Sequence, residues 1–341
     1  MIEGETNVRS VQFGEGVFSE VGAEIGRFLV TTMQVPWQIA QPRLQPRPEA
    51  VLHVEDMELA TLDRQLAEAP TVDTVLAIGG GQAIDLGKYI AWRRGVRLVS
   101  VPTILSVDAF VTPAAGIRRD NRVDYVGQTS PDPLLIDYDL IRTAPPELNI
   151  AGVGDLLSIQ TACFDWELAA QAGGSEYPYR AEDVAKARGI LADTIARVDD
   201  IRACTDDGLR AIVEGYMRVN TICLPAGHYR VEEGSEHYLF YELEERLRRP
   251  FVHGWIVGLG IYLLSRLQEH RHREVVDFMD AVGLRYQPAD LEIDRKDLTA
   301  ALLNLRQYVE GRGDLWYTVI NQKVSDTDWV ASALAGLKFQ S

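Results

Sequence analysis

The chain contains little cysteine and lacks any long apolar run. Its three cysteines, Cys163, Cys204 and Cys223, lie in unrelated contexts without CxxC spacing. This predicts reduced thiols packed inside a protein, not a disulfide framework or a cysteine metal site. The N-terminus MIEGETNVRS lacks the profile of a signal peptide, and no apolar stretch could cross a bilayer. We therefore expect a cytoplasmic protein with no membrane partner.

Positive charge is also scarce. Lys and Arg number 34 against 50 Asp and Glu, which gives a formal net charge of −16. Because nucleic acids and anionic membrane surfaces would be repelled, neither is an expected partner. An anionic substrate would need local cations or backbone amides to overcome this field. The 341 residues are 46% hydrophobic, enough for two domains of ordinary size.

The first half of the chain alternates between strand-like and helix-like segments. Strand-like runs are expected at 9–18, 28–35, 74–80 and 96–103, and helical patterns at 20–28, 57–69 and 83–95. Buried strands separated by helices are typical of a doubly wound, mostly parallel α/β sheet. The intervening stretch 35–48, VPWQIAQPRLQPRP, is rich in proline and lacks a period, so we predict a loop there.

The pattern changes near TAPPELNIAGVGD, residues 143–155. After the prolines and glycines of this stretch, nearly every segment has apolar residues at helical spacing, for example 181–198 and 207–224. We predict an α/β dinucleotide-binding domain over residues 1–144, followed by an all-α domain over 145–341 that binds metal and substrate.

A glycine run follows the strand-like segment in VLAIGGGQAIDLGKYIA, residues 75–91. Without Cβ atoms, Gly79, Gly80 and Gly81 would let a phosphate approach the N–H groups at a helix start. A tight turn that needs no ligand explains the same residues. The phosphate interpretation gains support from the next strand, VRLVSVPTILSVD, whose end brings further polar side chains to the same carboxyl edge of the sheet.

Three later segments offer candidate metal ligands. Asp155 lies at a helix start in GVGDLL, His237 in GSEHYLF and His253 in FVHGWIVGLG. One carboxylate and two imidazoles would form a three-ligand divalent site with an open position, as catalytic metals require. Taken singly, Asp155 is better explained as an N-cap, and each histidine as a hydrogen-bonded interior residue.

These motifs, taken in order, resemble a known family. The GGG turn, SVPTILSVD, GVGDLLSIQTACFDWELA, GSEH and HGWIVGLG are similar to those of the sn-glycerol-1-phosphate dehydrogenases. That family belongs to the metal-dependent (iron-containing) alcohol dehydrogenase and dehydroquinate synthase-like superfamily. The resemblance spans about residues 8 to 270 and implies a dehydroquinate synthase-like fold. Family members are commonly homo-oligomers, which is therefore expected here.

The resemblance also implies roles for individual residues. Those matching cofactor contacts are Gly79, Gly80, Gly81, Asp85, Thr103, Ser106 and Thr112. Asp108 matches an acidic residue that binds substrate hydroxyls, and Asp155, His237 and His253 match the metal ligands, for zinc first and iron or nickel as alternatives. Asp as the first ligand, where dehydroquinate synthases use Glu, favours the dehydrogenase branch.

Four positions depart from the family pattern. Tyr241 stands where relatives place a second, substrate-contacting histidine, and Trp255 where they commonly have Glu. Both changes are expected to alter the wall of the substrate pocket. Thr31 and Thr32 lie near the place where NAD-preferring relatives carry an Asp for the ribose. Either NAD(H) or NADP(H) therefore remains a candidate cofactor.

The leading hypothesis is a metal-dependent NAD(P)-linked dehydrogenase of a small polyol, hydroxyketone or glycerol-phosphate-like substrate. The metal would act as a Lewis acid on the substrate oxygen while Asp108 orients a neighbouring hydroxyl. A sugar-phosphate cyclase that uses NAD transiently is the first alternative. A pseudoenzyme or binding protein with a decayed cofactor site is the second, motivated by the proline-rich segment 35–48.

Overall fold

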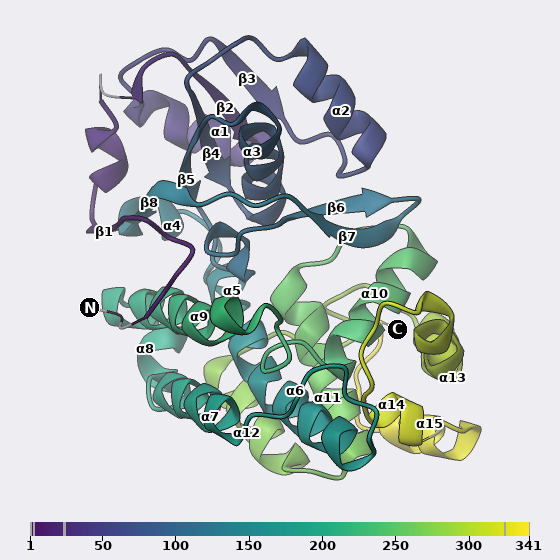
Figure 1. Cartoon of the computed structure of the whole chain (residues 1–341). Helices are drawn as coiled ribbons and strands as arrows, with labels where there is room; N and C mark the ends of the chain where they lie inside the picture. The colour runs from purple at the N-terminus through teal and green to yellow at the C-terminus, as the bar shows by residue number, and fades with distance from the viewer. Residues whose placement is uncertain (1, 3, 23–24, 324, 341) are drawn as a thin grey trace.

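The computed structural model describes residues 2, 4–22, 25–323 and 325–340. A six-stranded sheet with its helices forms one layer, and a bundle of helices forms the other (Figure 1). A two-stranded hairpin lies between these layers on one side of the molecule (Figure 1). The predicted fold class, an α/β part followed by an all-helical part, is confirmed.

The six-stranded sheet is parallel throughout, with the order β1-β8-β5-β4-β2-β3. Its strands are β1 (Val11–Gly14), β2 (Phe28–Thr32), β3 (Ala50–His53), β4 (Thr74–Gly79), β5 (Arg97–Pro102) and β8 (Pro131–Asp137). The chain runs outward from β2 to β3, returns to β4 beside β2, and continues the other way through β5. Strand order therefore reverses between β2 and β4, which is where open α/β sheets bind ligands. The glycine run follows β4 at this point.

Helices cover both faces of the sheet. Because side chains alternate along a strand, Val75 and Ala77 of β4 face one hydrophobic core, and Leu76 and Ile78 face another. The first core includes residues of α2 (Leu59–Glu68) and α3 (Gly81–Arg94) and continues into the helical layer. The second core includes residues of the turn η1 (Val17–Glu20), α1 (Gln34–Ala40) and α4 (Tyr138–Ile141).

The predicted loop over residues 35–48 is wrong at its N-terminal half. This segment begins with α1 (Gln34–Ala40) and continues as the 3₁₀ turn η3 (Gln41–Arg43). Pro36 falls in the first turn of α1, where its missing N–H leaves no helical hydrogen bond unmade. Trp37 and Ile39 pack against the second core, and this burial stabilises the short helix. Of the helix expected at 20–28, residues 23–24 lie outside the described residues, and Phe28 already belongs to β2.

The hairpin of β6 (Ala115–Arg119) and β7 (Arg122–Val126) was not predicted from the sequence. Its turn residues Asp120 and Asn121 have φ angles of 53° and 64°, the left-handed values that a two-residue hairpin turn favours. The hairpin is tied to helix α10 (Ser235–Leu247) by two ion pairs, Arg118–Glu244 and Arg122–Glu245.

The helical layer begins after Pro145. Its helices are α5 (Pro146–Ile150), α6 (Val153–Gln171), α7 (Ala181–Ile195), α8 (Val198–Arg202), α9 (Asp206–Ala226), α10 (Ser235–Leu247), α11 (His253–Gln268), α12 (His272–Val282), α13 (Arg295–Arg312), α14 (Val319–Gln322) and α15 (Thr327–Leu334). The domain boundary at residue 144 stays a prediction, since the first hydrophobic core runs through both layers. Within the described part of the chain, none of the helices has the length and apolar character needed to span a membrane.

One buried cation holds the segment after β5 against α3. Lys88 is 2% exposed, and its ammonium donates to the carbonyl oxygens of Ala109 (2.8 Å), Thr112 (3.4 Å) and Ala114. The same ammonium lies 2.8 Å from Asp85 Oδ1. Because a buried charge is stable only when it is paired and hydrogen-bonded, these contacts fix the path of the chain from residue 109 to 114.

We expect Lys88→Met to lower the free energy of unfolding by about 3 kcal/mol, because the substitution leaves Asp85 and three carbonyl groups without their donor. Urea denaturation followed by circular dichroism measures this. Lys186→Met is the control, since Lys186 is an exposed residue of α7 whose one ion pair in the described part of the chain is with Glu182. Equal effects of the two substitutions would contradict the proposed structural role of Lys88.

Candidate metal and cofactor site

The three predicted metal ligands come from the starts of three helices. Asp155 is the third residue of α6, His237 the third of α10 and His253 the first of α11. One ligand atom from each lies within 4.8 Å of the other two. The structure therefore brings together side chains that are up to 98 residues apart in the sequence.

Close backbone contacts between helices make this convergence possible. A Cβ atom on Gly254 would lie 1.7 Å from the carbonyl oxygen of Ala151, and one on Gly154 would lie 2.4 Å from the carbonyl oxygen of Gly254. Only glycine permits such approaches, so the starts of α6 and α11 touch through their backbones. Likewise, a Cβ on Gly260 of α11 would lie 2.5 Å from the carbonyl oxygen of Glu236 in α10.

The candidate ligand atoms are arranged as they would be around a bound cation. His253 Nε2 lies 3.0 Å from Asp155 Oδ1, but without hydrogen-bond geometry, and this buried oxygen has no hydrogen-bond partner among the described residues. A buried carboxylate oxygen without a donor is costly. A divalent ion between the carboxylate and the two imidazoles would remove that cost, and one oxygen and two nitrogen ligands suit zinc, iron or nickel.

Glu236 orients one of these ligands. Its Oε1 atom lies 2.9 Å from His237 Nδ1 and accepts a hydrogen bond from Gly234 N at 2.7 Å. Burial lowers the pKa of His237, but the hydrogen bond and charge of Glu236 outweigh burial and raise that pKa to about 9. With Nδ1–H directed at Glu236, the other ring nitrogen, Nε2, is the one left for a metal.

Asp165 fixes the start of helix α10, two residues before His237. Its Oδ2 atom accepts a hydrogen bond from Ser235 N at 2.8 Å, and its Oδ1 atom accepts one from Val319 N at 2.9 Å. Burial raises the pKa of Asp165 to about 6. Helix α6 thus supplies one ligand directly and positions a second through Asp165. Neither Glu236 nor Asp165 was predicted from the sequence to have a role, and the GSEH motif was the only signal for Glu236.

The segment after β5 docks the sheet onto the helical layer beside the three ligands. Leu105 N donates to Asn149 Oδ1 (3.2 Å), Gly254 N donates to Ser106 O (3.1 Å), and Asp108 N donates to Asp155 Oδ2 (3.2 Å). Thr103 and Ser106 are buried here. Burial and the charge of Asp155 raise the pKa of Asp108 despite the opposing effect of Lys88. Asp108, predicted to bind substrate hydroxyls, therefore lies beside the candidate metal ligands.

The glycine run forms the turn between β4 and α3. Gly79 has a φ of +149°, Gly80 is the N-cap, and α3 begins at Gly81 without a side-chain cap. Its first N–H groups therefore remain available to an anion. The glycines also serve packing, because Cβ atoms at Gly80 and Gly81 would lie 2.8 and 2.7 Å from side-chain atoms of Ile104 and Val107.

The other predicted cofactor contacts have identifiable partners. Asp85 pairs with Lys88, and Thr112 Oγ1 lies within 3.5 Å of Lys88 Nζ and Ala109 O. The Thr31 hydroxyl donates to Ala83 O at 2.9 Å, so it joins β2 to α3 and is fully buried. Thr32 is also buried at the end of β2. The strand itself ends in these two threonines and not in a carboxylate residue.

Aromatic side chains surround the ligands on the α10 side. The Tyr241 ring lies 6.4 Å from that of His237, and the Phe240 ring lies 4.9 Å from that of His253. Tyr125 reaches from β7 so that its hydroxyl lies 3.5 Å from the Tyr241 hydroxyl. Tyr125 is 49% exposed, although burial raises its pKa. Tyr125 and Tyr241 therefore bring two hydroxyls together on this side of the ligands.

Trp255 is close to His253 in the sequence but points to a different side of α11. It lies two residues after His253 in α11, and residues two apart on a helix point to different sides. Its indole N–H donates to Glu147 O at 3.2 Å, and the Arg285 guanidinium stacks 5.2 Å from its ring. Of the two departures from the family pattern, Tyr241 is therefore the one that lies beside a ligand.

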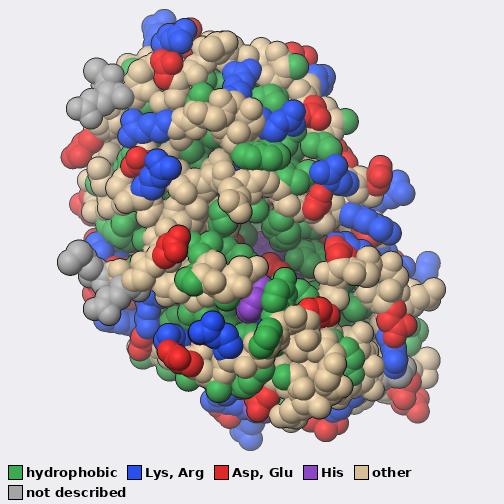
Figure 2. Space-filling view, viewed as in Figure 1, with side chains coloured by type: hydrophobic (Ala, Val, Ile, Leu, Met, Phe, Trp, Pro, Cys, Tyr) green, Lys and Arg blue, Asp and Glu red, His purple; other side chains and the backbone are tan. Residues whose placement is uncertain are grey.

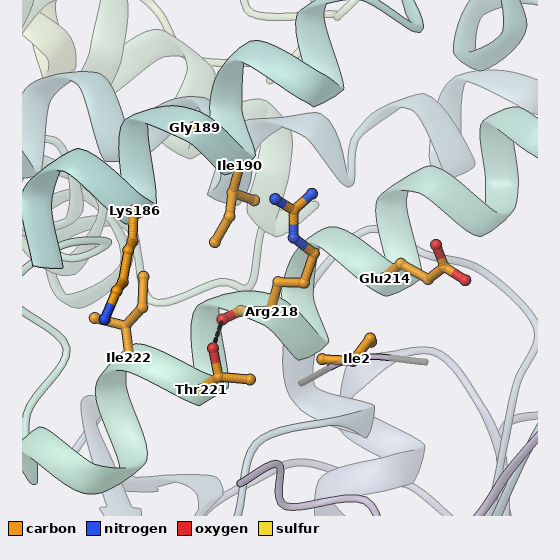
Figure 3. A pocket seen from close by; sticks show the side chains of 8 residues that line it. All are labelled: Ile2, Lys186, Gly189, Ile190, Glu214, Arg218, Thr221 and Ile222. Atoms are coloured by element: carbon orange, nitrogen blue, oxygen red, sulfur yellow. Dashed lines mark hydrogen bonds between the residues drawn. The ribbon is translucent and has the colours of Figure 1, made fainter. Parts of the chain in front are cut away.

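Figure 2 shows a hollow between the two layers, with histidine and acidic side chains in its floor and hydrophobic side chains around them. A separate groove of about 550 Å³ lies between α7 and α9 (Figure 3). Its cations, Lys186 and Arg218, are paired with Glu182 and Asp193. This groove contains none of the candidate site residues.

Comparison with known proteins places the chain in a family. A family model described as iron-containing alcohol dehydrogenase matches residues 13–145. A glycerol-1-phosphate dehydrogenase (NAD(P)+) of Hyperthermus butylicus is 30% identical over 259 residues, covering 76% of this chain and 72% of the relative. The chain belongs to the glycerol-1-phosphate dehydrogenase family, among the iron-containing alcohol dehydrogenases. A family member from Halorubrum lacusprofundi is 27% identical over 340 residues, covering 96% of this chain and 95% of its own.

Solved structures share the fold. A probable glycerol dehydrogenase from Sinorhizobium meliloti superposes with a TM-score of 0.74 at 20% identity, covering 96% of this chain and 95% of that one. Glycerol dehydrogenase from Schizosaccharomyces pombe gives 0.70 at 19% identity, covering 98% and 91%. The expected family and two-part fold are thus confirmed. Membership in this dehydrogenase family supports NAD(P) and a metal as cofactors, without deciding which metal.

We expect Gly254→Ala to disrupt the site, because the new Cβ would collide with Ala151 O. The free energy of unfolding should fall by about 3 kcal/mol, and zinc affinity should fall with it. Gly189→Ala is the matched control, since Gly189 lies in α7 with open space around its Cβ position. That substitution should instead stabilise the protein by about 0.5–1 kcal/mol. Urea denaturation and zinc titration measure both effects, and a Gly254→Ala variant as stable as the wild type would contradict the packing argument.

We further expect Glu236→Ala to weaken zinc binding by about 10–100-fold, because His237 loses the carboxylate that orients its ring. Glu236→Gln keeps an acceptor oxygen for both hydrogen bonds and should give a smaller loss. Competition with a chelator measures affinity, and the visible spectrum of the cobalt-substituted protein reports ligand geometry.

Glu242→Gln is the control for these variants. Glu242 is a buried acid on the same helix that pairs with Arg246 and Asn304. It should bind zinc as the wild type does. Wild-type zinc affinity in Glu236→Ala would show that Glu236 does not orient the ligand.

Proposed function

We propose that this protein is a metal-dependent NAD(P)-linked dehydrogenase that interconverts a small hydroxylated substrate and the corresponding carbonyl compound. The observation that carries the proposal is the convergence of Asp155, His237 and His253 beside the segment that follows β5. The relatives, named as NAD(P)+-dependent glycerol-1-phosphate dehydrogenases, support the reaction class.

The proposed cofactor site is the glycine turn at the carboxyl edge of the sheet. The N–H groups at the start of α3 would hold the pyrophosphate, and Thr103, Ser106 and Thr112 would line the path toward the metal ligands. Because β2 ends in Thr31 and Thr32 without a carboxylate, a 2′-phosphate would not be repelled there. This supports NADP(H) alongside NAD(H).

The proposed metal ligands are Asp155, His237 and His253, and zinc fits their mixed oxygen and nitrogen set, with iron or nickel as alternatives. When bound, the ion would supply Lewis acidity at the substrate oxygen, so that the hydroxyl loses its proton more easily. Glu236 and Asp165 hold His237 in place for this role. Self-association is proposed on the family resemblance alone.

Asp108 and Tyr241 would orient the substrate. Asp108, held against Asp155, would accept a hydrogen bond from a substrate hydroxyl next to the reacting carbon. Tyr241 would close the side of the pocket beside His237. When bound, an oxidised nicotinamide would accept the hydride that the substrate carbon loses while the hydroxyl proton is released, so that the products would be the carbonyl compound and NAD(P)H. Holding the substrate in one orientation, as Asp108 and Tyr241 would do, lowers the activation barrier by several kcal/mol.

We expect Asp155→Ala and His253→Ala each to lose bound zinc and to lower kcat/KM by at least about a hundredfold, because the loss of one ligand removes the metal and with it the Lewis acidity at the substrate oxygen. Elemental analysis and the absorbance of reduced nicotinamide measure these losses over a panel of polyols and hydroxyketones. His53→Ala, at an exposed histidine at the end of β3, is the control and should keep both metal and turnover. Full zinc occupancy in Asp155→Ala would contradict the proposed ligand set. Substrate consumption without net nicotinamide reduction would instead favour the cyclase alternative.

A further inference from the structure

A buried cation, Arg230, lies in the turn that joins α9 to α10. Its side chain is fully buried, and among the described residues it forms no ion pair. Two of its guanidinium nitrogens, Nε and Nη1, have no hydrogen-bond partner there, and burial lowers the pKa of Arg230. A cation in the interior is destabilising when no charge balances it. Packing alone therefore does not account for an arginine at this position.

The third guanidinium nitrogen of Arg230 joins two distant parts of the chain. Nη2 donates to the carbonyl oxygen of Asp165 in α6 at 3.3 Å and to that of Tyr317 at 3.1 Å. Tyr317 belongs to the segment between α13 and α14, and the guanidinium also lies 5.3 Å from the ring centre of Trp316 in that segment. An apolar side chain of similar length could fill this space, but it has no N–H group for the two carbonyls.

The segment that Arg230 holds is itself bonded to the first turn of α10. Its Trp316 N–H donates to the hydroxyl oxygen of Tyr238 at 2.8 Å, and Tyr238 directly follows the candidate ligand His237. The carboxylate of Asp165 accepts from Val319 N at 2.9 Å and, through its other oxygen, from the first residue of α10 at 2.8 Å. The segment is therefore bonded to the start of α10 both directly and through Asp165.

The turn that carries Arg230 lies directly on α6. The Ser158 hydroxyl of α6 donates to the carbonyl oxygen of Glu232 at 2.5 Å. A Cβ atom on Gly234, the N-cap of α10, would lie 2.8 Å from Cα of Ala162, so the backbones touch there. Because Asp155 lies on the same helix α6, the seating of this turn sets how far α10 stands from that ligand.

We propose that Arg230 is a positioning residue for the candidate metal site. Its guanidinium holds the segment 316–319 against α6 and the turn before α10, and this fixes His237 at the distance from Asp155 that a divalent ion requires. The inference rests on the ligand set of the proposed function, and it adds a residue that acts through Asp165 and the first turn of α10. It also gives the segment 316–319 a role in metal binding.

Zinc binding provides the first test. Arg230→Met fills a similar space without donors, so zinc affinity, measured by competition with a chelator, should fall at least tenfold. The visible spectrum of the cobalt-substituted protein should change as well, because the orientation of His237 changes. Arg230→Lys keeps the positive charge but lacks the planar donor fork. Its zinc affinity should lie between those of Arg230→Met and the wild type.

Arg94→Met is the matched control. Arg94 is the last residue of α3, at the opposite end of that helix from the glycine turn, and its guanidinium donates to the carbonyl oxygens of Leu66 (2.6 Å), Ala69 (2.6 Å) and Pro70. The substitution therefore removes the same kind of arginine-to-carbonyl bonds. It should lower the midpoint of urea denaturation while leaving zinc affinity and the cobalt spectrum as in the wild type.

Hydrogen exchange of the metal-free protein provides the second test, because it reports positioning without any bound ion. Mass spectrometry resolves the exchange to short peptides. In Arg230→Met the amides of residues 235–238 and 316–319 should exchange at least tenfold faster than in the wild type, since the segment that covers the first turn of α10 is no longer held. Arg94→Met should leave both peptides unchanged.

The outcomes separate this inference from the proposed function. Wild-type zinc affinity in Arg230→Met would overturn the inference, as would an equal loss of affinity in Arg94→Met. Where Arg230→Met does not fold, Arg230→Lys decides: zinc binding at least threefold weaker than in the wild type supports the inference, and wild-type binding overturns it. A protein that binds zinc with this dependence on Arg230 but transfers no hydride would overturn the dehydrogenase proposal and leave the positioning role standing.

Discussion

The site depends on helices that approach each other more closely than side chains normally allow. At Gly154 and Gly254 the first turns of α6 and α11 meet backbone to backbone, and at Gly260 helix α11 meets the first turn of α10. The side chains that project from these first turns are then forced into one small volume. Asp155 directly follows Gly154, and His253 directly precedes Gly254. A larger distance between the starts of α6 and α11 would therefore separate the candidate ligands before it disturbed the rest of the core.

The same contact also aligns the two layers. Gly254, which packs on Ala151, donates its N–H to Ser106 in the segment after β5, and Asp155 accepts from the N–H of Asp108 in that segment. Lys88 fixes the continuation of that segment to α3, the helix that starts at the glycine turn. One continuous set of contacts, made by backbone groups and by the side chains of Asp155 and Lys88, therefore sets the separation between the proposed pyrophosphate site and the candidate metal ligands. Hydride transfer requires such a fixed separation.

The sequence was informative where residue type alone carries the chemistry. A GGG run after an apolar strand, and histidines next to Gly and Ser in motifs of a known family, identified residues that the fold brings together. It was uninformative where tertiary contacts decide. Residues 35–48 read as a loop because proline counts against a helix, but the first turn tolerates Pro36 and the core buries Trp37. Asp165 and Ser235 are 70 residues apart, and no local pattern predicts their hydrogen bond.

In a chain with a net charge of −16, an anionic dinucleotide needs local positive charge to offset the field of the protein. The start of α3 presents backbone N–H groups, whose partial positive charge is fixed in place by the helix and does not depend on any lysine or arginine. Lys88, Arg118 and Arg312 are bound to other carboxylates, so the proposed pyrophosphate site does not draw on them. The fixed start of α3 would therefore orient a dinucleotide with its pyrophosphate at the glycine turn and its nicotinamide toward the candidate metal ligands.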